Sequence, residues 1–153
     1  MPGDFILSSQ VDTDVEYATQ WREGISTLIT TIQQAGMKVG IAIKPSTSIH
    51  YLTEDPSLVS IIQSSVDLIL VMTVEPGFSG QAFMKHIMPK VVTVRTQFPM
   101  KDIQVDGGLA PDTVDDATKA GANVIVAASA IFNAVDRKQV MDQIRTSIVK
   151  YNK

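Results

Sequence analysis

The fold of this chain is decided by one stretch, Asp102-Ile103-Gln104-Val105-Asp106-Gly107-Gly108. Apolar and polar residues alternate and then meet an acid and two glycines, a pattern typical of a buried strand that ends in a sharp turn. Pro111 is expected to begin the next helix, because a first-turn position does not need its missing N–H. In parallel α/β enzymes a carboxylate at a strand end commonly serves catalysis. An Asp-Gly turn without chemistry is the alternative interpretation.

Length and composition indicate one globular domain over residues 1–153, with 44% hydrophobic and 19% charged residues. The net charge of −3 gives no reason to expect nucleic acid or an anionic membrane as a partner. The absence of cysteine excludes a disulfide scaffold and a thiolate zinc site. No apolar run reaches the roughly 20 residues that span a bilayer, and the first residues lack the basic region of a signal peptide. We therefore expect a cytoplasmic protein.

Strand and helix patterns alternate along the chain, which predicts βαβ units and a parallel sheet. Strands are expected at residues 5–7, 39–43, 67–74, 102–106 and 124–126, and the 67–74 strand is apolar enough for burial on both faces. Residues 8–20 are polar without a period and predict a loop. Helices are expected at 21–36, after Pro56, at 83–98 with a bend at Pro89, at 111–120 and at 137–151, with a short helical turn at 129–133.

Two architectures fit this alternation, a doubly wound open sheet and a (β/α) barrel. A complete barrel has eight strands and typically about 250 residues. The pattern here supplies about five strands in 153 residues. The chain is therefore expected to be either a small open sheet or part of a barrel.

Two further stretches follow strands and carry candidate ligand-binding residues. The 67–74 strand leads into a loop, residues 75–81, in which Gly77 and Gly80 flank Phe78. Such a loop can bring backbone amides close to a ligand and act as a hinged lid, or it can be a flexible connection only. The small residues after the last strand, Ala127 to Ala130, can expose amides to a phosphate, or they can allow close helix–strand packing.

The order of these stretches adds information that no single motif carries. A glycine loop, an acid and a small-residue segment follow successive strands. Because the carboxyl ends of parallel strands meet at one edge of a sheet, all three are expected to face one site. That arrangement suits proton transfer at a carbon atom of a phosphorylated substrate.

Segments 36–45, 71–83, 90–108 and 120–131 closely resemble the ribulose-phosphate 3-epimerase family of (β/α)8 TIM barrels, and the similarity covers about residues 25–150. Its most specific motifs run from Met72 to Phe78 and from Val105 to Gly108. The resemblance implies interconversion of D-ribulose 5-phosphate and D-xylulose 5-phosphate, a step of the pentose phosphate pathway, through a metal-stabilised enediolate. It also implies two aspartates on opposite faces of C3. The divalent metal, commonly zinc, with iron, manganese or cobalt as other choices, is held by two aspartates and two histidines.

The resemblance assigns a role to each matching residue of this sequence. Asp106 corresponds to the second aspartate, which is both a catalytic group and a metal ligand. Substrate-binding positions are matched by Met72 in the pocket wall, by Gly77, Phe78, Ser79 and Gly80 in the substrate loop, by Gly107, Gly108 and Leu109 on the phosphate side, and by Ala128 and Ser129 at the phosphate.

Three departures from the family pattern stand out. Ser79 and Ala128 replace glycines, and Ala128 is tolerable unless its backbone needs a positive φ. The third departure is larger, because nothing here corresponds to the first catalytic aspartate or to the two histidine ligands. His50 and His86 fall away from the predicted strand ends and are expected to be surface residues.

We therefore expect an incomplete barrel of about five βα units that lacks the first three strands. An incomplete gene model, a splice variant and a shortened paralogue all stay open as its origin. The leading functional hypothesis is an epimerase chain that is inactive alone, and the alternative is a non-catalytic phosphate-binding or regulatory paralogue. The expected partners are a pentose 5-phosphate and, through open sheet edges, other copies of the chain.

Overall fold

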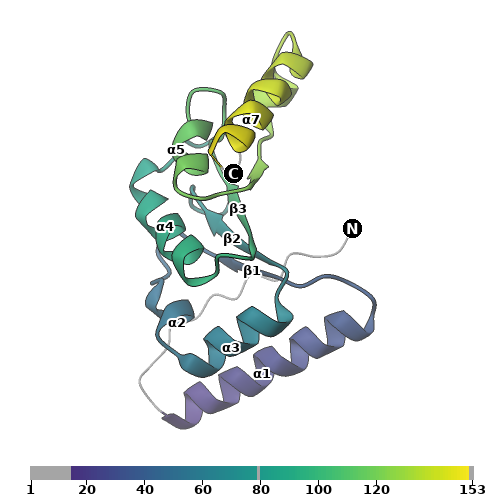
Figure 1. Ribbon diagram of the computed structural model, residues 1–153, viewed down its shortest axis with the longest axis vertical. Coiled ribbons are helices and arrows are strands. Elements are labelled where there is room, and N and C mark those ends of the chain that lie inside the picture. The colour runs from purple at the N-terminus through teal and green to yellow at the C-terminus, as the bar shows by residue number, and fades with distance from the viewer. Residues whose placement is uncertain (1–14, 79, 152–153) are drawn as a thin grey trace.

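A parallel sheet of four strands forms the centre of the chain in the computed structural model, which describes residues 15–78 and 80–151. The strands lie side by side in chain order (Figure 1): β1 (Gly40–Ile43), β2 (Leu68–Met72), β3 (Asp102–Asp106) and β4 (Val124–Val126). All three neighbouring pairs are parallel, as the alternating pattern predicted. The expected strand at residues 5–7 lies outside the described residues.

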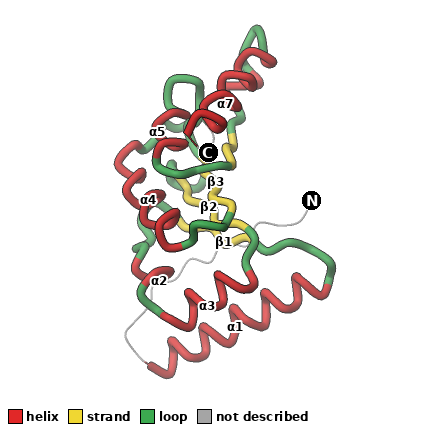
Figure 2. The backbone as a smooth tube through the Cα atoms, viewed as in Figure 1, coloured by secondary structure: helices red, strands yellow, loops and turns green. Residues whose placement is uncertain are grey.

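The helices gather around this sheet in groups (Figure 2). They are α1 (Val15–Gln34), α2 (His50–Thr53), α3 (Pro56–Ser65), the 3-10 turn η1 (Lys85–Ile87), α4 (Met88–Gln97), α5 (Val114–Lys119), α6 (Ser129–Phe132) and α7 (Arg137–Tyr151). Helices α1 and α3 run side by side at one end of the molecule, α4 packs against β2 and β3, and α5 contacts α7 at the other end. In the described part of the chain, no helix is both long and apolar enough to cross a membrane.

The two faces of the sheet differ in burial. Side chains of β2 and β3 that point towards α4, among them Val71 and Val105, are fully buried in one core cluster with Phe98. On the opposite face, Leu70 and Met72 are only half-buried, because the helices of the described chain leave that side partly open. The prediction that the 67–74 strand is buried on both faces is therefore wrong for this structure.

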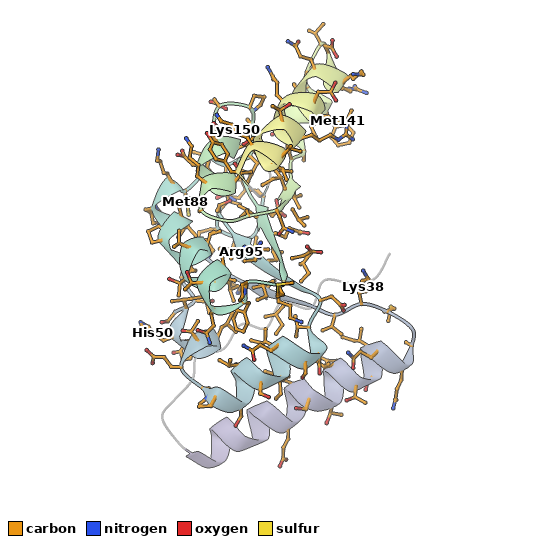
Figure 3. All side chains as sticks on the ribbon, viewed as in Figure 1. Lys38, His50, Met88, Arg95, Met141 and Lys150 are labelled. Atoms are coloured by element: carbon orange, nitrogen blue, oxygen red, sulfur yellow. The ribbon has the colours of Figure 1, made fainter. Side chains whose placement is uncertain are left out.

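Arg95 fixes the amino ends of β3 and β4. Its guanidinium donates to the carbonyl oxygens of Pro99, Lys101 and Gly121 and to Oδ1 of Asn123, at 2.8 to 2.9 Å. Burial lowers the pKa of Arg95 from its ordinary value. Arg95 lies on α4 and is labelled in Figure 3. This network sits at the edge opposite to the predicted site and holds the strands in place there.

Three element boundaries differ from those predicted. Helix α1 begins at Val15 and not near Trp21, because a surface helix can extend through polar residues once its apolar stripe is anchored. Pro89 lies in the first turn of α4, where proline is well tolerated, and so it begins that helix and does not bend it. Pro111 does not begin α5, because residues 111–113 form a turn in which the Thr113 hydroxyl accepts from the Ala110 amide at 2.9 Å.

We predict that the 153-residue chain self-associates in solution. In the described residues β1 and β4 each pair with one strand only, and the half-buried face of β2 carries the apolar residues Leu68, Leu70 and Met72. Unpaired strand edges and exposed apolar surface both favour contact with another chain. Light scattering combined with chemical denaturation tests this. A monodisperse monomer that unfolds cooperatively with a stability of about 5 kcal/mol or more would contradict the prediction.

Candidate active site

A cavity of about 370 Å³ lies at the carboxyl ends of the strands, and its walls come from the segments that follow β2, β3 and β4. Parallel register explains why these segments meet, since Met72 is the neighbour of Asp106 across the sheet and Asp106 is the neighbour of Val126. The lining residues are Met72, Val74, Glu75, Pro76, Gly77, Phe78, Gly80, Gln81, Asp106, Gly107, Gly108, Leu109, Val126, Ala127, Ala128 and Ser129. Every candidate site residue named from the sequence is therefore on this wall, apart from Ser79, which lies outside the described residues.

Asp106 is the last residue of β3 and is half-buried at the cavity. Two glycines follow it with positive φ values, +123° at Gly107 and +69° at Gly108. A Cβ atom on Gly107 would lie 2.8 Å from the Val74 amide nitrogen, and one on Gly108 would lie 2.5 Å from that of Phe83. These separations are shorter than real Cβ contacts allow, so the turn after β3 needs glycine at both positions.

The glycine loop after β2 is held by a side chain of its own. The Gln81 amide donates to the carbonyl oxygens of Glu75 at 2.6 Å and of Phe78 at 2.9 Å. Gly77 and Gly80 both have positive φ, with open space where a Cβ would be, and the Phe78 ring is 73% exposed. Gly77, Phe78 and Gly80 thus line the cavity, and the movement of this loop as a lid stays a prediction.

Ala128 does not adopt the positive φ that favours glycine. Its φ is −111° and its ψ is −80°, so the positive φ that would demand glycine is not used here. The Ala128 carbonyl accepts from the amides of Ile131 and Phe132 in α6. Ala128 and Ser129 are both exposed, and both line the cavity.

The donors present do not form a metal cage by themselves. Within residues 15–78 and 80–151, no group of three or more His, Cys, Asp or Glu side chains lies close enough together to hold an ion. His50 and His86 are both exposed, as predicted. His50, labelled in Figure 3, lies on α2 and pairs with Glu54. Four-ligand cages are typical for zinc, and the role of Asp106 as a metal ligand stays a prediction.

Two buried or half-buried residues that sequence reasoning missed hold backbone segments at the carboxyl edge of the sheet. Lys90 on α4 donates to three carbonyl oxygens of the loop after β1, those of Lys44, Pro45 and Thr47, at 2.6 to 3.3 Å. Burial lowers the Lys90 pKa, and the charge of a nearby glutamate partly opposes that shift. Thr73, directly after β2, is fully buried and bonds to the backbone at the end of β3. Its signal in the sequence was a single polar residue inside an apolar run.

A larger hollow of about 510 Å³ between α5 and α7 has a structural explanation. Asp115 on α5 accepts from the Ser147 hydroxyl at 2.6 Å and from the Tyr151 hydroxyl at 3.1 Å. These hydrogen bonds, Ser147 first, lower the pKa of the Asp115 carboxyl. The hollow is therefore the open side of a helix–helix contact, and it lies away from the strand ends.

Comparison with known proteins agrees with this geometry. The model of the ribulose-phosphate 3 epimerase family matches residues 11–132, a range that includes the whole cavity wall. The chain belongs to the ribulose-phosphate 3-epimerase family. A ribulose-phosphate 3-epimerase of Eremothecium gossypii is 46% identical over 121 residues, which cover 79% of this chain and 48% of the relative. The cytoplasmic isoform of Oryza sativa subsp. japonica is 45% identical over 128 residues, covering 84% and 53%.

The chain thus spans about half the length of the curated epimerases that it matches. Among solved structures, 3-hexulose-6-phosphate synthase from Salmonella typhimurium superposes with a TM-score of 0.59 at 19% identity, covering 86% of this chain and 58% of that one. At this identity the likeness concerns the fold alone. It agrees with a parallel α/β architecture of the TIM-barrel type.

We predict that Gly108→Ala costs more stability than Gly36→Ala, although both glycines have nearly the same φ, +69° and +73°. A Cβ at Gly36 meets nothing within 4 Å, so that variant pays only for backbone strain, about 1 kcal/mol. At Gly108 the clash with the Phe83 backbone adds to the strain, and we expect a total of roughly 3 kcal/mol. Chemical denaturation of both variants measures the difference, and equal losses would contradict the close approach of the two loops.

Proposed function

We propose that this chain provides one acid–base group and the phosphate side of a ribulose-phosphate 3-epimerase site, for a D-ribulose 5-phosphate or D-xylulose 5-phosphate substrate. The observation that carries the proposal is the gathering of Asp106, the glycine loop and Ser129 on one cavity wall in a member of this family. The cavity is of the size expected for a small-molecule site, on the order of 300 Å³ or more.

Asp106 is the proposed proton-transfer group. As a carboxylate it can take the proton from C3 of the sugar, which leaves the electron pair of the broken C–H bond in an enediolate. As a carboxylic acid it can return a proton to C3 in the opposite direction of the reaction. Epimerisation needs the two transfers to occur on opposite faces of C3, so Asp106 serves one face and a second group must serve the other.

The phosphate is proposed to bind near Gly108 and Ser129. Backbone amides and the Ser129 hydroxyl are suitable donors to a dianion, and they lie on the same wall as Asp106. Binding energy gained at the phosphate, away from C3, would orient the reacting carbon at the carboxylate. Gly77 to Gly80 would close over the sugar from the side of β2, with Met72 against the substrate.

Asp106 is the one proposed ligand in this chain for a divalent metal. Zinc is the preferred ion, and iron, manganese and cobalt are the other choices. The described residues do not form a metal cage, so no step is assigned to the ion. When bound, such an ion supplies Lewis-acid stabilisation of developing oxygen charge. We further propose an incomplete barrel and a cytoplasmic location, in line with one relative that is named a cytoplasmic isoform.

The alternative is a non-catalytic phosphate-binding or regulatory paralogue. One observation favours it. Glu75 and Asp106 are the carboxylates among the described lining residues, and both come from the same edge of the sheet, whereas epimerisation needs a proton-transfer group on each face of C3. Metal analysis distinguishes the two functions. A catalytically complete assembly should hold stoichiometric divalent metal, and a phosphate-binding paralogue should not.

We predict that the 153-residue chain alone has negligible epimerase activity. One carboxylate cannot serve both faces of C3, and a single ligand holds a divalent ion poorly. A steady-state assay with D-ribulose 5-phosphate and added zinc tests this, with a full-length member of the family as the positive control. A turnover above about 1 per second, the low end for ordinary enzymes, would contradict the prediction.

We predict that the phosphate site works without catalysis. The chain should bind pentose 5-phosphates weakly, and Ser129→Asp should abolish binding, because the new carboxylate repels the phosphate dianion. Ser129→Asn is the matched control, because asparagine has nearly the same size as aspartate and no charge, and this variant should retain measurable affinity. Isothermal titration calorimetry decides the matter, and equal affinities for the unaltered chain and Ser129→Asp would refute the assignment.

A further inference from the structure

Thr73 connects two segments that line the cavity, the one that follows β2 and the one that follows β3. It follows the last residue of β2, and it is 0% exposed. Its amide donates to the Asp106 carbonyl at 2.7 Å, and its own carbonyl accepts from the Met84 amide at 2.9 Å. Its backbone therefore extends the β2–β3 pairing by one residue and ties it to the segment that enters α4.

The side chain of Thr73 adds contacts that the backbone cannot make. Its hydroxyl lies 2.7 Å from the Gly107 carbonyl oxygen and 3.0 Å from the Asp106 carbonyl oxygen. A hydroxyl has one proton, so the two carbonyls share a single donor, with the shorter contact at Gly107. Strand pairing has ended at this point, and the Gly107 carbonyl belongs to the turn that follows Asp106.

We propose that Thr73 is a positioning residue for Asp106, an inference that rests on the proposed function. The hydroxyl contacts the carbonyls of the two peptide groups that flank Gly107, and the first of these groups is joined to the Cα atom that carries the Asp106 side chain. These contacts set the direction in which the carboxylate enters the cavity. They also set the path of the backbone to Gly108, whose amide is proposed to face the phosphate. One buried hydroxyl thus fixes the reacting end and the anion end of the site together.

A structural role alone would give a different pattern, and another buried threonine allows the comparison. Thr118 on α5 is 1% exposed, and its hydroxyl contacts the Val114 carbonyl at 3.0 Å and the Ser147 hydroxyl at 2.7 Å. It is as buried and as well bonded as Thr73, but it lies in the contact between α5 and α7. Removing either hydroxyl should lower stability, whereas only Thr73 should affect the cavity.

The experiment compares the unaltered 153-residue chain with Thr73→Val, Thr73→Ser and Thr118→Val. Valine keeps the shape of threonine without the hydroxyl, and serine keeps the hydroxyl. Three quantities are measured for each chain: the affinity for D-ribulose 5-phosphate by calorimetry, deuterium uptake in residues 102–110 by mass spectrometry, and the free energy of unfolding by chemical denaturation.

We expect Thr73→Val to bind the sugar phosphate about tenfold more weakly and to take up deuterium in residues 102–110 several times faster. Both effects correspond to the loss of about one hydrogen bond. Thr73→Ser should stay within about twofold of the unaltered chain in both readouts. Thr118→Val should lose stability and change neither. This pattern would establish the positioning role.

Three results would overturn it. The first is unchanged affinity and uptake in Thr73→Val, and the second is an equal loss in Thr73→Ser, which would assign the effect to the methyl group. The third is a Thr73→Val chain that fails to fold where Thr118→Val folds, which would make Thr73 a stability residue only. If the unaltered chain binds no sugar phosphate, the proposed function fails. Deuterium uptake in residues 102–110 is then the only test of the positioning role. Faster uptake in Thr73→Val than in Thr118→Val would support the role, and equal uptake would contradict it.

Discussion

The close approach of two backbone segments at the carboxyl edge of the sheet constrains everything around it. The turn after β3 presses on the segment after β2 so tightly that neither Gly107 nor Gly108 has room for a Cβ atom. The Thr73 hydroxyl bonds across the same contact. Because these segments cannot separate without losing the contact, Asp106 and the base of the glycine loop keep a fixed relation. The cavity is lined by the residues of these segments, and of the segment after β4, that lie outside this contact.

One face of the sheet is fully buried and the other is only partly buried. Towards α4, Ile69, Val71 and Ile103 are 0% exposed. On the other face Leu70 and Met72 are half-buried, and Asp106 ends the same row. The candidate site therefore belongs to the open face, while the stability of the described part comes mainly from the closed one. The α5–α7 contact and the Arg95 network add to that stability away from the cavity.

The sequence allowed the four described strands and the order of the site segments to be predicted, because both follow from local periodicity and from glycine placement. The positions of Gly107, Ser129 and Phe78 on one wall followed from parallel topology alone. What could not be predicted depends on contacts distant in sequence. Thr73 bonds to residues 33 and 34 positions away, and Lys90 to a loop more than 40 positions away. The start of α1 was missed because a polar helix end has no period of its own.

Binding and catalysis separate physically in such a cavity. A sugar phosphate can be held by donors on one wall, whereas inversion at carbon needs proton-transfer groups on both sides of the planar enediolate. Asp106 ends β3 and Glu75 lies in the loop after the neighbouring strand β2, so both carboxylates come from the carboxyl edge of the sheet. Under the proposed function, a second group has to arrive across the half-exposed face that carries Leu70. Whatever segment or second chain covers that face would bury its apolar residues and complete the site at once. Stability and catalysis would then depend on one surface.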